Sequence, residues 1–379
     1  MQIASARLDE IALDLVEPFE TSFGVERRRQ FLLLRLESRD GLVGWGECVA
    51  SLDPLYSSES NVSARDMLLR HLLPGILKGR SVTPESFHAD VARFRGNMMA
   101  KAAVEAALVD LAAQARRVSV ARYLGARRVR IVVGVSVGIQ PSVRRLVDRV
   151  GRYRDDGYGR VKLKVRPGWD AEPVAAVRRA FPDLDLWVDA NQAYPPAAAE
   201  RIRAWAERHH VAQVEQPFAE RAIRAHAELA RGASFRVCLD ESIVDEASLE
   251  DALAARAITS LNVKTGRVGG PLHGRALAAR AARARVPAWI GGMLESGIGR
   301  AHNVALAGRA EMTLPADLSA SNRYYREDLI DPPFVLGPGS TLAVPDGPGI
   351  GVTISERVLR RHRRRSHLVR ARRSPKGGA

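Results

Sequence analysis

Residues 160–166 read "RVKLKVR", and the pattern of this short stretch gives the first indication of the fold. Apolar residues alternate with Lys162 and Lys164, so a β-strand here carries apolar side chains on one face and two amines on the other. Of the 58 basic residues, only six are lysine. Arginine stays protonated in proteins, whereas a buried lysine can lose its proton and act as a base. The two lysines are therefore candidates for catalysis.

Eight short apolar segments, including this one, follow one another between residues 130 and 318. They are "RIVVGVSVGI", "VKLKV", "LDLWVDANQ", "VAQVEQPF", "RVCLDESI", "ITSLNVKTG", "VPAWIGGM" and "AEMTLPADL". Helical patterns such as residues 196–210 and 269–284 separate them. Strands that alternate with helices predict a parallel sheet, and eight strands are the number found in a (β/α)8 barrel.

An ionisable residue ends each of five consecutive predicted strands. Successive members are 25, 26, 25 and 24 residues apart, which is one strand–helix unit each time: Lys164, Asp189, Glu215, Asp240 and Lys264. In a barrel, the carboxyl ends of the strands meet on the face that carries the active site. We therefore expect these five side chains to line one pocket.

The chain outside this region divides into three further parts. Residues 1–127 predict an α+β domain with a hairpin and an alanine-rich helix at 99–115, and residues 128–318 would form the barrel. The Pro/Gly-rich segment 319–356 is expected to return to the N-terminal sheet.

The basic end of the chain carries most of its net charge of +15. Residues 357–379 contain nine arginines, one lysine and no acid. A block of like charges predicts a solvated, disordered extension. The alternative is that this segment contacts nucleic acid or an anionic surface.

Amino-acid composition indicates the cellular compartment that we expect for the protein. Cys48 and Cys238 are the only cysteines, which excludes a disulfide framework and suits a reducing compartment. The N-terminus has no apolar signal-peptide core, and no stretch of about 20 apolar residues is present. We expect a cytoplasmic protein that does not enter a membrane.

Three carboxylates in one pocket require compensation of their charge. Asp189, Glu215 and Asp240 would repel one another unless a cation lies between them. Oxygen ligands suit a hard cation such as Mg²⁺, with Mn²⁺ as an alternative. The metal would stabilise a substrate carboxylate while a flanking lysine removes a proton. The competing interpretation is that the acids pair with some of the many arginines.

The strand motifs resemble those of the enolase superfamily. They are "VKLKV", "VDANQAY", "VEQPF", "CLDES", "NVKTGRVGG" and "GGMLESGIGRAHNVALA". Residues 1 to about 355 are similar to the muconate-lactonising-like subgroup, and within it to the o-succinylbenzoate synthase / N-succinylamino acid racemase family. This resemblance implies an α/β fold: a (β/α)7β TIM-type barrel with an α+β capping domain built from the N-terminus and the C-terminal segment.

The resemblance also implies the reaction. It is a Mg²⁺-dependent syn-dehydration of 2-succinyl-6-hydroxy-2,4-cyclohexadiene-1-carboxylate through an enediolate, as part of menaquinone biosynthesis. The alternative is racemisation of N-succinylamino acids by two lysines, and one protein could do both. The partner would be a small-molecule carboxylate, and by analogy with other barrels we expect a homo-oligomer.

Residue roles follow from the same resemblance. Asp189, Glu215 and Asp240 would bind the metal. Lys164 would remove the α-proton, Lys264 would stabilise charge or act as the second base, and Lys162 would contact the substrate carboxylate. Segments 17–24 and 51–60 resemble two lid loops. The other expected substrate contacts are Ser136, Asn191, Arg267, Gly291, Gly292, Met293, Phe19, Phe23 and Tyr56.

Overall fold

A curled sheet of seven parallel strands forms the centre of the larger unit in the computed structural model, which describes residues 1–371. The strand order is β11-β10-β9-β8-β7-β6-β5, so strands that are consecutive in the chain are neighbours in the sheet. This arrangement confirms the predicted succession of parallel strands. Their bounds are β5 (Val135–Val137), β6 (Arg160–Lys164), β7 (Asp185–Asp189), β8 (Gln213–Glu215), β9 (Arg236–Leu239), β10 (Ser260–Val263) and β11 (Ala288–Ile290).

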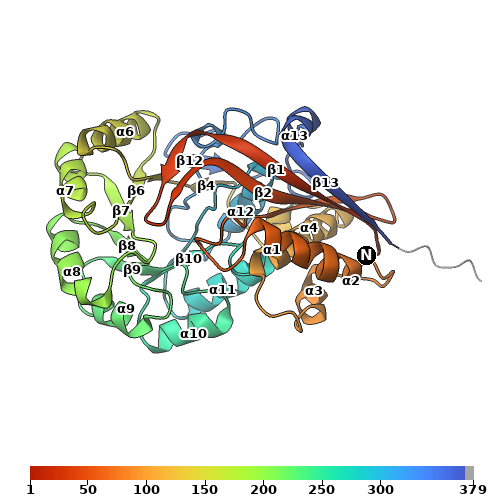
Figure 1. Cartoon of the computed structure of the whole chain (residues 1–379), viewed down its shortest axis with the longest axis horizontal. Coiled ribbons are helices and arrows are strands. Elements are labelled where there is room, and N and C mark those ends of the chain that lie inside the picture. The colour runs from red at the N-terminus through yellow and green to blue at the C-terminus, as the bar shows by residue number, and fades with distance from the viewer. Residues whose placement is uncertain (372–379) are drawn as a thin grey trace, which may run out of the picture.

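Helices cover the outer surface of this sheet (Figure 1). In β6, Val161 and Leu163 pack in the apolar core beneath the helices, whereas Lys162 and Lys164 face the interior and meet carboxylates there. The alternation of "RVKLKVR" thus has a direct structural cause. The helices are α6 (Val143–Asp155), α7 (Ala171–Ala180), η2 (Pro196–Ala198), α8 (Ala199–Arg208), α9 (Ile223–Ala230), α10 (Glu246–Ala254), α11 (Pro271–Arg283) and α12 (Gly297–Ala307).

The predicted eighth strand at 310–318 is an extended segment rather than a regular strand. Thr313 N donates to Ala288 O (2.9 Å), which joins the segment to β11. On its other side, Ala316 N donates to Val132 O (2.9 Å). Gly134 N, which directly precedes β5, donates to Ala316 O (2.8 Å), so the segment lies between β11 and the start of β5.

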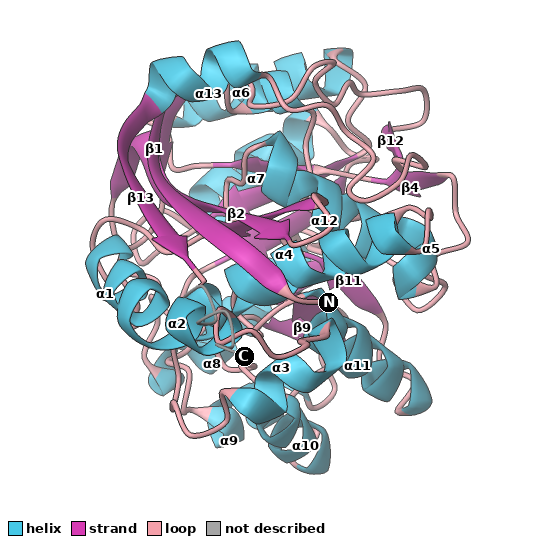
Figure 2. Ribbon diagram, turned by 90° about the vertical axis from the view of Figure 1, so that its right-hand side faces the viewer, coloured by secondary structure: helices cyan, strands magenta, loops and turns pink. Residues whose placement is uncertain are grey.

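An antiparallel sheet in the order β13-β1-β2-β3 forms the centre of the smaller unit, the cap (Figure 2). The predicted hairpin is confirmed, because β2 and β3 pair antiparallel. The strand bounds are β1 (Ile3–Glu20), β2 (Val25–Ser38), β3 (Val43–Cys48) and β13 (Arg363–Arg370). The helices are α1 (Asn61–Met67), η1 (Leu68–Leu72), α2 (Leu73–Ile76), α3 (Pro84–Asp90), α4 (Met98–Ala115) and α5 (Val120–Leu124).

The turn between β1 and β2 brings the cap to the barrel. The two strands form one long hairpin that extends from the cap across the larger unit (Figure 1). At its tip, Ser22 Oγ donates to Asn191 O (3.2 Å), which follows β7. The N-terminal unit thus reaches the end of the barrel where the active site was predicted.

The segment 319–356 connects the two units. On the barrel side, β12 (Thr341–Ala343) pairs with β4 (Arg130–Val132). Toward the cap, Tyr325 pairs with Leu15 and Gly349 pairs with Ser119 in isolated β-bridges. The short helix η3 (Ser321–Arg323) precedes Tyr325. The segment therefore contacts the N-terminal unit and also forms a two-stranded ladder with β4.

The expectation of a disordered extension from residue 357 is wrong for its described part. Residues 356–370 form α13 (Glu356–His362) and β13, and β13 pairs antiparallel with β1. Acids distant in sequence compensate the arginines: Arg361 donates to Glu327 Oε2 (2.5 Å). A like-charge block reveals nothing about such partners. The end of that predicted tail, residues 372–379, lies outside the described residues.

Two smaller expectations concern membranes and thiols. Among residues 1–371, no helix is long and apolar enough to cross a bilayer. Cys48 and Cys238 are both buried and unpaired, as expected of a chain without a disulfide framework.

Close packing of β3 against α4 depends on Gly46, and this generates a prediction. A Cβ at Gly46 would lie 2.0 Å from the Ala103 carbonyl oxygen, which belongs to helix backbone. We expect Gly46→Ala to lower the free energy of unfolding by about 1–3 kcal/mol, because the helix must move away from the sheet. Gly75→Ala is the matched control, since no atom lies within 4 Å of its Cβ position. Equal denaturant midpoints for the two variants would contradict this packing.

The pairing of β13 with β1 generates a second prediction. Asp9 is fully buried and accepts a hydrogen bond from Ser366 Oγ (2.6 Å) on β13. Deletion of residues 363–379 removes this donor, so we expect a loss of about 1–3 kcal/mol in unfolding free energy. Deletion of residues 372–379 alone leaves the β1–β13 pairing intact and serves as the control. The same thermal midpoint for both truncations would show that β13 adds no stability.

Candidate active site

The register of the parallel strands brings the five predicted side chains to one end of the sheet. Lys164 is paired with Asp189, and Asp189 with Glu215. Asp240 directly follows β9, and Lys264 directly follows β10. All five are buried, and the three carboxylates are fully shielded from solvent.

The three carboxylates form a compact cluster. One oxygen from each of Asp189, Glu215 and Asp240 lies within 4.8 Å of the others. Close by, Glu241 Oε2 is buried and has no hydrogen-bond partner within residues 1–371. A cluster of carboxylate oxygens is a ligand set for a hard divalent cation, so these residues fit a metal of that class.

Each carboxylate of the cluster contacts a lysine. Lys164 Nζ donates to Asp189 Oδ2 (2.6 Å), and Lys264 Nζ donates to Asp240 Oδ2 (2.6 Å). Lys162 Nζ donates to Glu215 Oε2 (2.7 Å) and lies 3.3 Å from Asp189 Oδ2. These amines therefore compensate the buried negative charge, a role for which arginine was the competing interpretation.

Arginine contributes to the cluster at one position among the described residues. Arg267 donates through Nη1 to Asp240 Oδ1 and through Nε to the Ile243 carbonyl oxygen (2.6 Å). Tyr56 OH donates to the same Asp240 oxygen (2.9 Å). These contacts fix the orientation of the Asp240 carboxylate.

The pKa values of the buried acids shift in different directions. Burial raises the pKa of Glu215 to about 7, and the neighbouring Asp189 adds to the rise. Burial also raises the pKa of Glu241 to about 8, with Asp240 contributing. Burial acts on Asp240 in the same direction, but Lys264 and Arg267 hold its pKa well below the usual range. A cation placed among these groups would favour their charged forms.

The two amines that flank Asp189 and Asp240 in the strand order differ in their surroundings. Lys164 Nζ also donates to Asn191 Oδ1 (2.6 Å), an oxygen that carries no full charge. Burial lowers the pKa of Lys264, but Asp240 outweighs this and raises it above its ordinary value. Lys264 is thus held as a cation, with its Nζ 4.6 Å from the centroid of the Tyr56 ring.

A second carboxylate group lies next to the cluster at the base of the site. Asp317 Oδ2 accepts from Ser136 Oγ (2.7 Å) and lies 3.1 Å from Lys162 Nζ. Arg160 Nη1 donates to Asp317 Oδ1 (2.9 Å). Lys162 is therefore fixed between Glu215 and Asp317, so its ammonium position is set from two sides.

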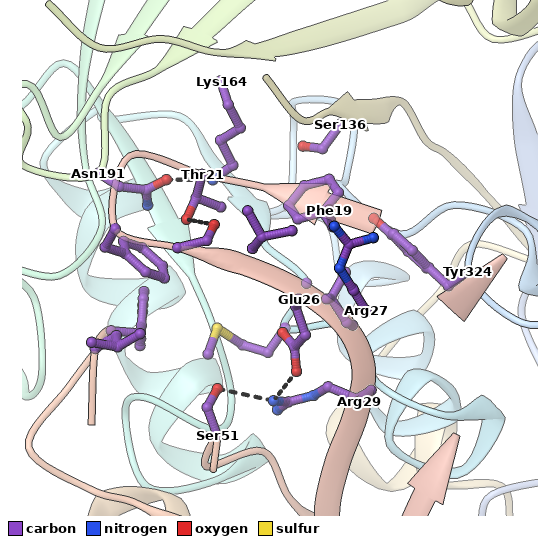
Figure 3. Close-up of a pocket in the computed structure, with 18 of the residues that line it drawn as sticks. Phe19, Thr21, Glu26, Arg27, Arg29, Ser51, Ser136, Lys164, Asn191 and Tyr324 are labelled. Carbon is purple, nitrogen blue, oxygen red and sulfur yellow. Dashed lines mark hydrogen bonds and ion pairs between the residues drawn. The ribbon is translucent and has the colours of Figure 1, made fainter. Parts of the chain in front are cut away.

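A cavity of about 250 Å³ opens above these side chains (Figure 3). The hairpin tip and the segment that includes residues 51–56 form its outer wall, and the barrel residues form its base. Ten of the predicted site residues line it: Phe19, Phe23, Tyr56, Ser136, Lys162, Lys164, Asn191, Lys264, Gly292 and Met293.

Two predicted substrate contacts are not among the residues that line the cavity. Arg267 lies behind Asp240, as described above. Gly291 faces Asn262, where a Cβ would lie 2.2 Å from Asn262 Oδ1. Asn262 in turn donates from Nδ2 to Glu215 Oε1 (2.6 Å). Arg267 therefore contacts a carboxylate of the cluster directly, whereas Gly291 lies against Asn262, which contacts another.

Sequence reasoning missed some residues of the site. Asn262 precedes Lys264 by two residues, as Lys162 precedes Lys164, so its inward direction could have been inferred from strand alternation. Asp317 lies in the last predicted strand segment, "AEMTLPADL", but is not among the expected site residues. Arg27 also lines the cavity and is exposed. No spacing signal could have identified it, because it comes from the cap.

This fold and this site define an enzyme of the enolase superfamily, and family comparisons agree. Residues 5–125 match the mandelate racemase / muconate lactonizing enzyme N-terminal domain, and residues 145–358 match the enolase C-terminal domain-like family. A solved enolase-superfamily structure from Listeria innocua superposes with a TM-score of 0.93 at 38% identity. It covers 98% of this chain and 100% of that one.

Comparison with individual relatives identifies the family within this superfamily. An N-succinylamino acid racemase from Amycolatopsis is 45% identical over 93% of this chain and 95% of its own length. An o-succinylbenzoate synthase from Listeria innocua is 39% identical over 96% of both chains. The chain belongs to the o-succinylbenzoate synthase / N-succinylamino acid racemase family of the enolase superfamily.

The carboxylate cluster predicts the effect of removing one ligand. Asp189→Asn should weaken Mg²⁺ binding by more than about 100-fold, since even loss of an outer partner of a metal ligand costs about 10- to 100-fold. Isothermal titration of the purified protein measures this change. Asp183→Asn, an exposed aspartate before the same strand, should bind Mg²⁺ as the unmodified protein does. Unchanged affinity in Asp189→Asn would remove Asp189 from the ligand set.

Proposed function

We propose that this enzyme is an o-succinylbenzoate synthase that dehydrates 2-succinyl-6-hydroxy-2,4-cyclohexadiene-1-carboxylate in menaquinone biosynthesis. The observation that carries the proposal is the position of two lysines on either side of the carboxylate cluster. Lys164 ends β6 and Lys264 follows β10, with three strands between them in the sheet. A carboxylate substrate bound at the cluster would therefore have an amine over each face.

We propose Asp189, Glu215 and Asp240 as ligands of Mg²⁺, with Mn²⁺ as a substitute. When bound, the ion would supply positive charge to the substrate carboxylate as its α-carbon loses a proton. Lys162, fixed between Glu215 and Asp317, would bind the same carboxylate and orient it. Metal and ammonium together favour the negative charge that develops there.

Proton transfer would be carried out by Lys164. In its neutral form it removes the α-proton and then, as an ammonium, gives that proton to the departing hydroxyl group on the same face of the ring. One residue can do both because a syn elimination places the two groups on one side. Lys264 on the other face stays protonated beside Asp240 and stabilises the developing charge.

The cavity wall supports a substrate with an apolar ring and an acidic arm. Phe19, Leu55 and Met293 supply apolar surface, and Arg27 supplies an exposed cation at the wall. The hairpin tip and the segment 51–60 come from the cap, so we propose that they act as lids that close over the bound ring and exclude water.

The proposed division of the chain into domains assigns the lids to one part and the base of the site to another. We propose residues 1–127 as the capping domain, 128–318 as a (β/α)7β barrel closed by the extended segment near residue 316, and 319–356 as the segment that joins them. The hydrogen bonds on both sides of that extended segment support closure of the barrel.

A second candidate activity is racemisation of N-succinylamino acids. The opposed lysines favour it, because removal of a proton from one face and return on the other requires two bases. The 45% identity to an N-succinylamino acid racemase supports the same activity. The chain could carry both reactions with one set of side chains.

Paired assays with Mg²⁺ test both activities. Lys164→Ala should lower the rate of dehydration by at least about 10²–10⁴-fold, the range expected for loss of a general acid–base group. Lys264→Arg should retain part of the dehydration activity, because it keeps the charge, but lose racemisation, because arginine does not deprotonate. Lys78→Ala, at an exposed position, is the matched control.

The outcomes separate the two proposals. Full dehydration activity in Lys164→Ala would exclude it as the base. Full racemase activity in Lys264→Arg would exclude the two-lysine route. If the unmodified protein racemises N-succinylamino acids but leaves the cyclohexadiene substrate unchanged, the racemase is the function and the synthase proposal fails.

A further inference from the structure

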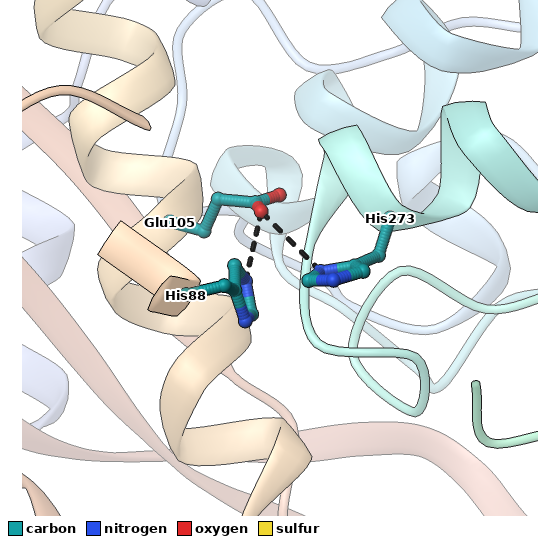
Figure 4. A group of neighbouring side chains, drawn as sticks. All are labelled: His88, Glu105 and His273. Atoms are coloured by element: carbon teal, nitrogen blue, oxygen red, sulfur yellow. Dashed lines mark ion pairs between the residues drawn. The ribbon is translucent and has the colours of Figure 1, made fainter. Parts of the chain in front are cut away.

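A second group of potential metal ligands lies where the cap meets the barrel (Figure 4). His88 comes from α3 and Glu105 from α4, both in the cap, whereas His273 comes from α11 of the barrel. His88 Nε2 lies 2.9 Å from Glu105 Oε2, and His273 Nδ1 lies 3.6 Å from the same oxygen. One atom from each residue lies within 4.8 Å of the other two. We call this group the His–Glu–His cluster.

The three facing atoms lack hydrogen-bond partners in the described part of the chain. His88 Nε2, Glu105 Oε2 and His273 Nδ1 are each shielded from solvent, and their contacts do not have hydrogen-bond geometry. Glu105 is fully buried, and its other oxygen accepts from Leu272 N (2.7 Å), which fixes the carboxylate. Buried polar atoms are nearly always paired in folded proteins. A single cation would satisfy all three atoms at once.

The spacing of the cluster suits a small tetrahedral ion. Zinc bonds of about 2.0–2.1 Å to nitrogen and oxygen place tetrahedral ligands about 3.3 Å apart. The two measured separations, 2.9 and 3.6 Å, lie on either side of that value. The two imidazole nitrogens lie within 4.8 Å of each other, so three bonds would require rotation of the imidazole rings.

Two glycines allow the close approach of α11. A Cβ at Gly270 would lie 2.1 Å from Glu105 Oε1, and a Cβ at Gly269 would lie 3.2 Å from His88 Cε1. Both glycines have positive φ angles, 94° at Gly269 and 137° at Gly270. The loop before α11 is thus shaped so that His273 can reach the buried carboxylate.

We propose that the His–Glu–His cluster binds a divalent transition metal of the zinc class and thereby ties the cap to α11. Two imidazoles and one carboxylate are a ligand set for Zn²⁺, whereas the three carboxylates of the active site suit Mg²⁺. The His273 side chain is 39% exposed, so one side of the cluster lies near the protein surface. This site is separate from the proposed reaction and does not depend on it.

The test measures zinc bound per chain by equilibrium dialysis against ZnCl₂, with Mg²⁺ present. Because zinc also competes for the active-site carboxylates, the full-length Asp189→Asn variant is titrated beside the unmodified protein. We expect Asp189→Asn to retain one zinc per chain and to melt at a higher temperature with zinc than without it. Adding His273→Ala should weaken that zinc by at least about tenfold and remove the thermal shift.

Two further variants make the result specific. Glu105→Gln keeps an oxygen for Leu272 N but loses the anionic ligand, so in the Asp189→Asn protein it should weaken zinc binding as His273→Ala does. His71→Ala removes an exposed histidine of η1 outside the cluster and should change neither readout.

Two results would overturn the proposal. Equal zinc binding with and without His273 would leave the cluster as packed polar side chains only. Complete loss of zinc from the Asp189→Asn variant would mean that the metal binds only at the carboxylates of the active site. Neither result bears on the synthase or racemase activity, which is measured with its own substrates.

Discussion

Compensation of buried charge is the constraint on which the barrel depends. Asp189, Glu215 and Asp240 are fully shielded from solvent, and an isolated carboxylate in such a place would be strongly destabilising. A lysine approaches each of these acids, and Asn191, Asn262 and Arg267 donate to their other oxygens. At the strand ends, the interior of the barrel is therefore a network of opposite charges, next to a small apolar cluster of Trp187, Cys238 and Trp289. The same network contains the proposed metal ligands and bases, so stability and the proposed chemistry make the same demands on these positions.

Much of this network could be predicted from the sequence because it is periodic. The two-residue alternation in β6 assigns Lys162 and Lys164 to one face, and the regular spacing of 24–26 residues assigns each further acid or lysine to the end of the next strand. What could not be predicted depends on contacts between segments far apart in the chain. Two such contacts are the hydrogen bond from Ser136 to Asp317 and the ion pair between Arg267 and Asp240. The order of the basic segment 357–371 depends on acids of β1 and Glu327, which no local pattern reveals.

Several separate contacts join the cap to the barrel. The hairpin tip contacts the strand ends through Ser22, the segment 319–356 bridges both units, and the buried Glu105 of α4 meets His273 of α11. The cavity is lined by both units, so its shape depends on how they are held together. Specificity can therefore vary with residues of the hairpin and of the segment 51–60, while the charged base of the site stays the same.

The last strand of the cap sheet has a consequence for solubility. Without β13, the long strand β1 would present its open backbone edge to other proteins. With it, the outermost edge belongs to a strand in which Arg364 and Arg365 are exposed. Edges rich in positive charge resist the addition of foreign strands, because like charges repel and ammonium or guanidinium groups must stay hydrated. The arginines of β13 thus disfavour edge-to-edge aggregation of the cap sheet.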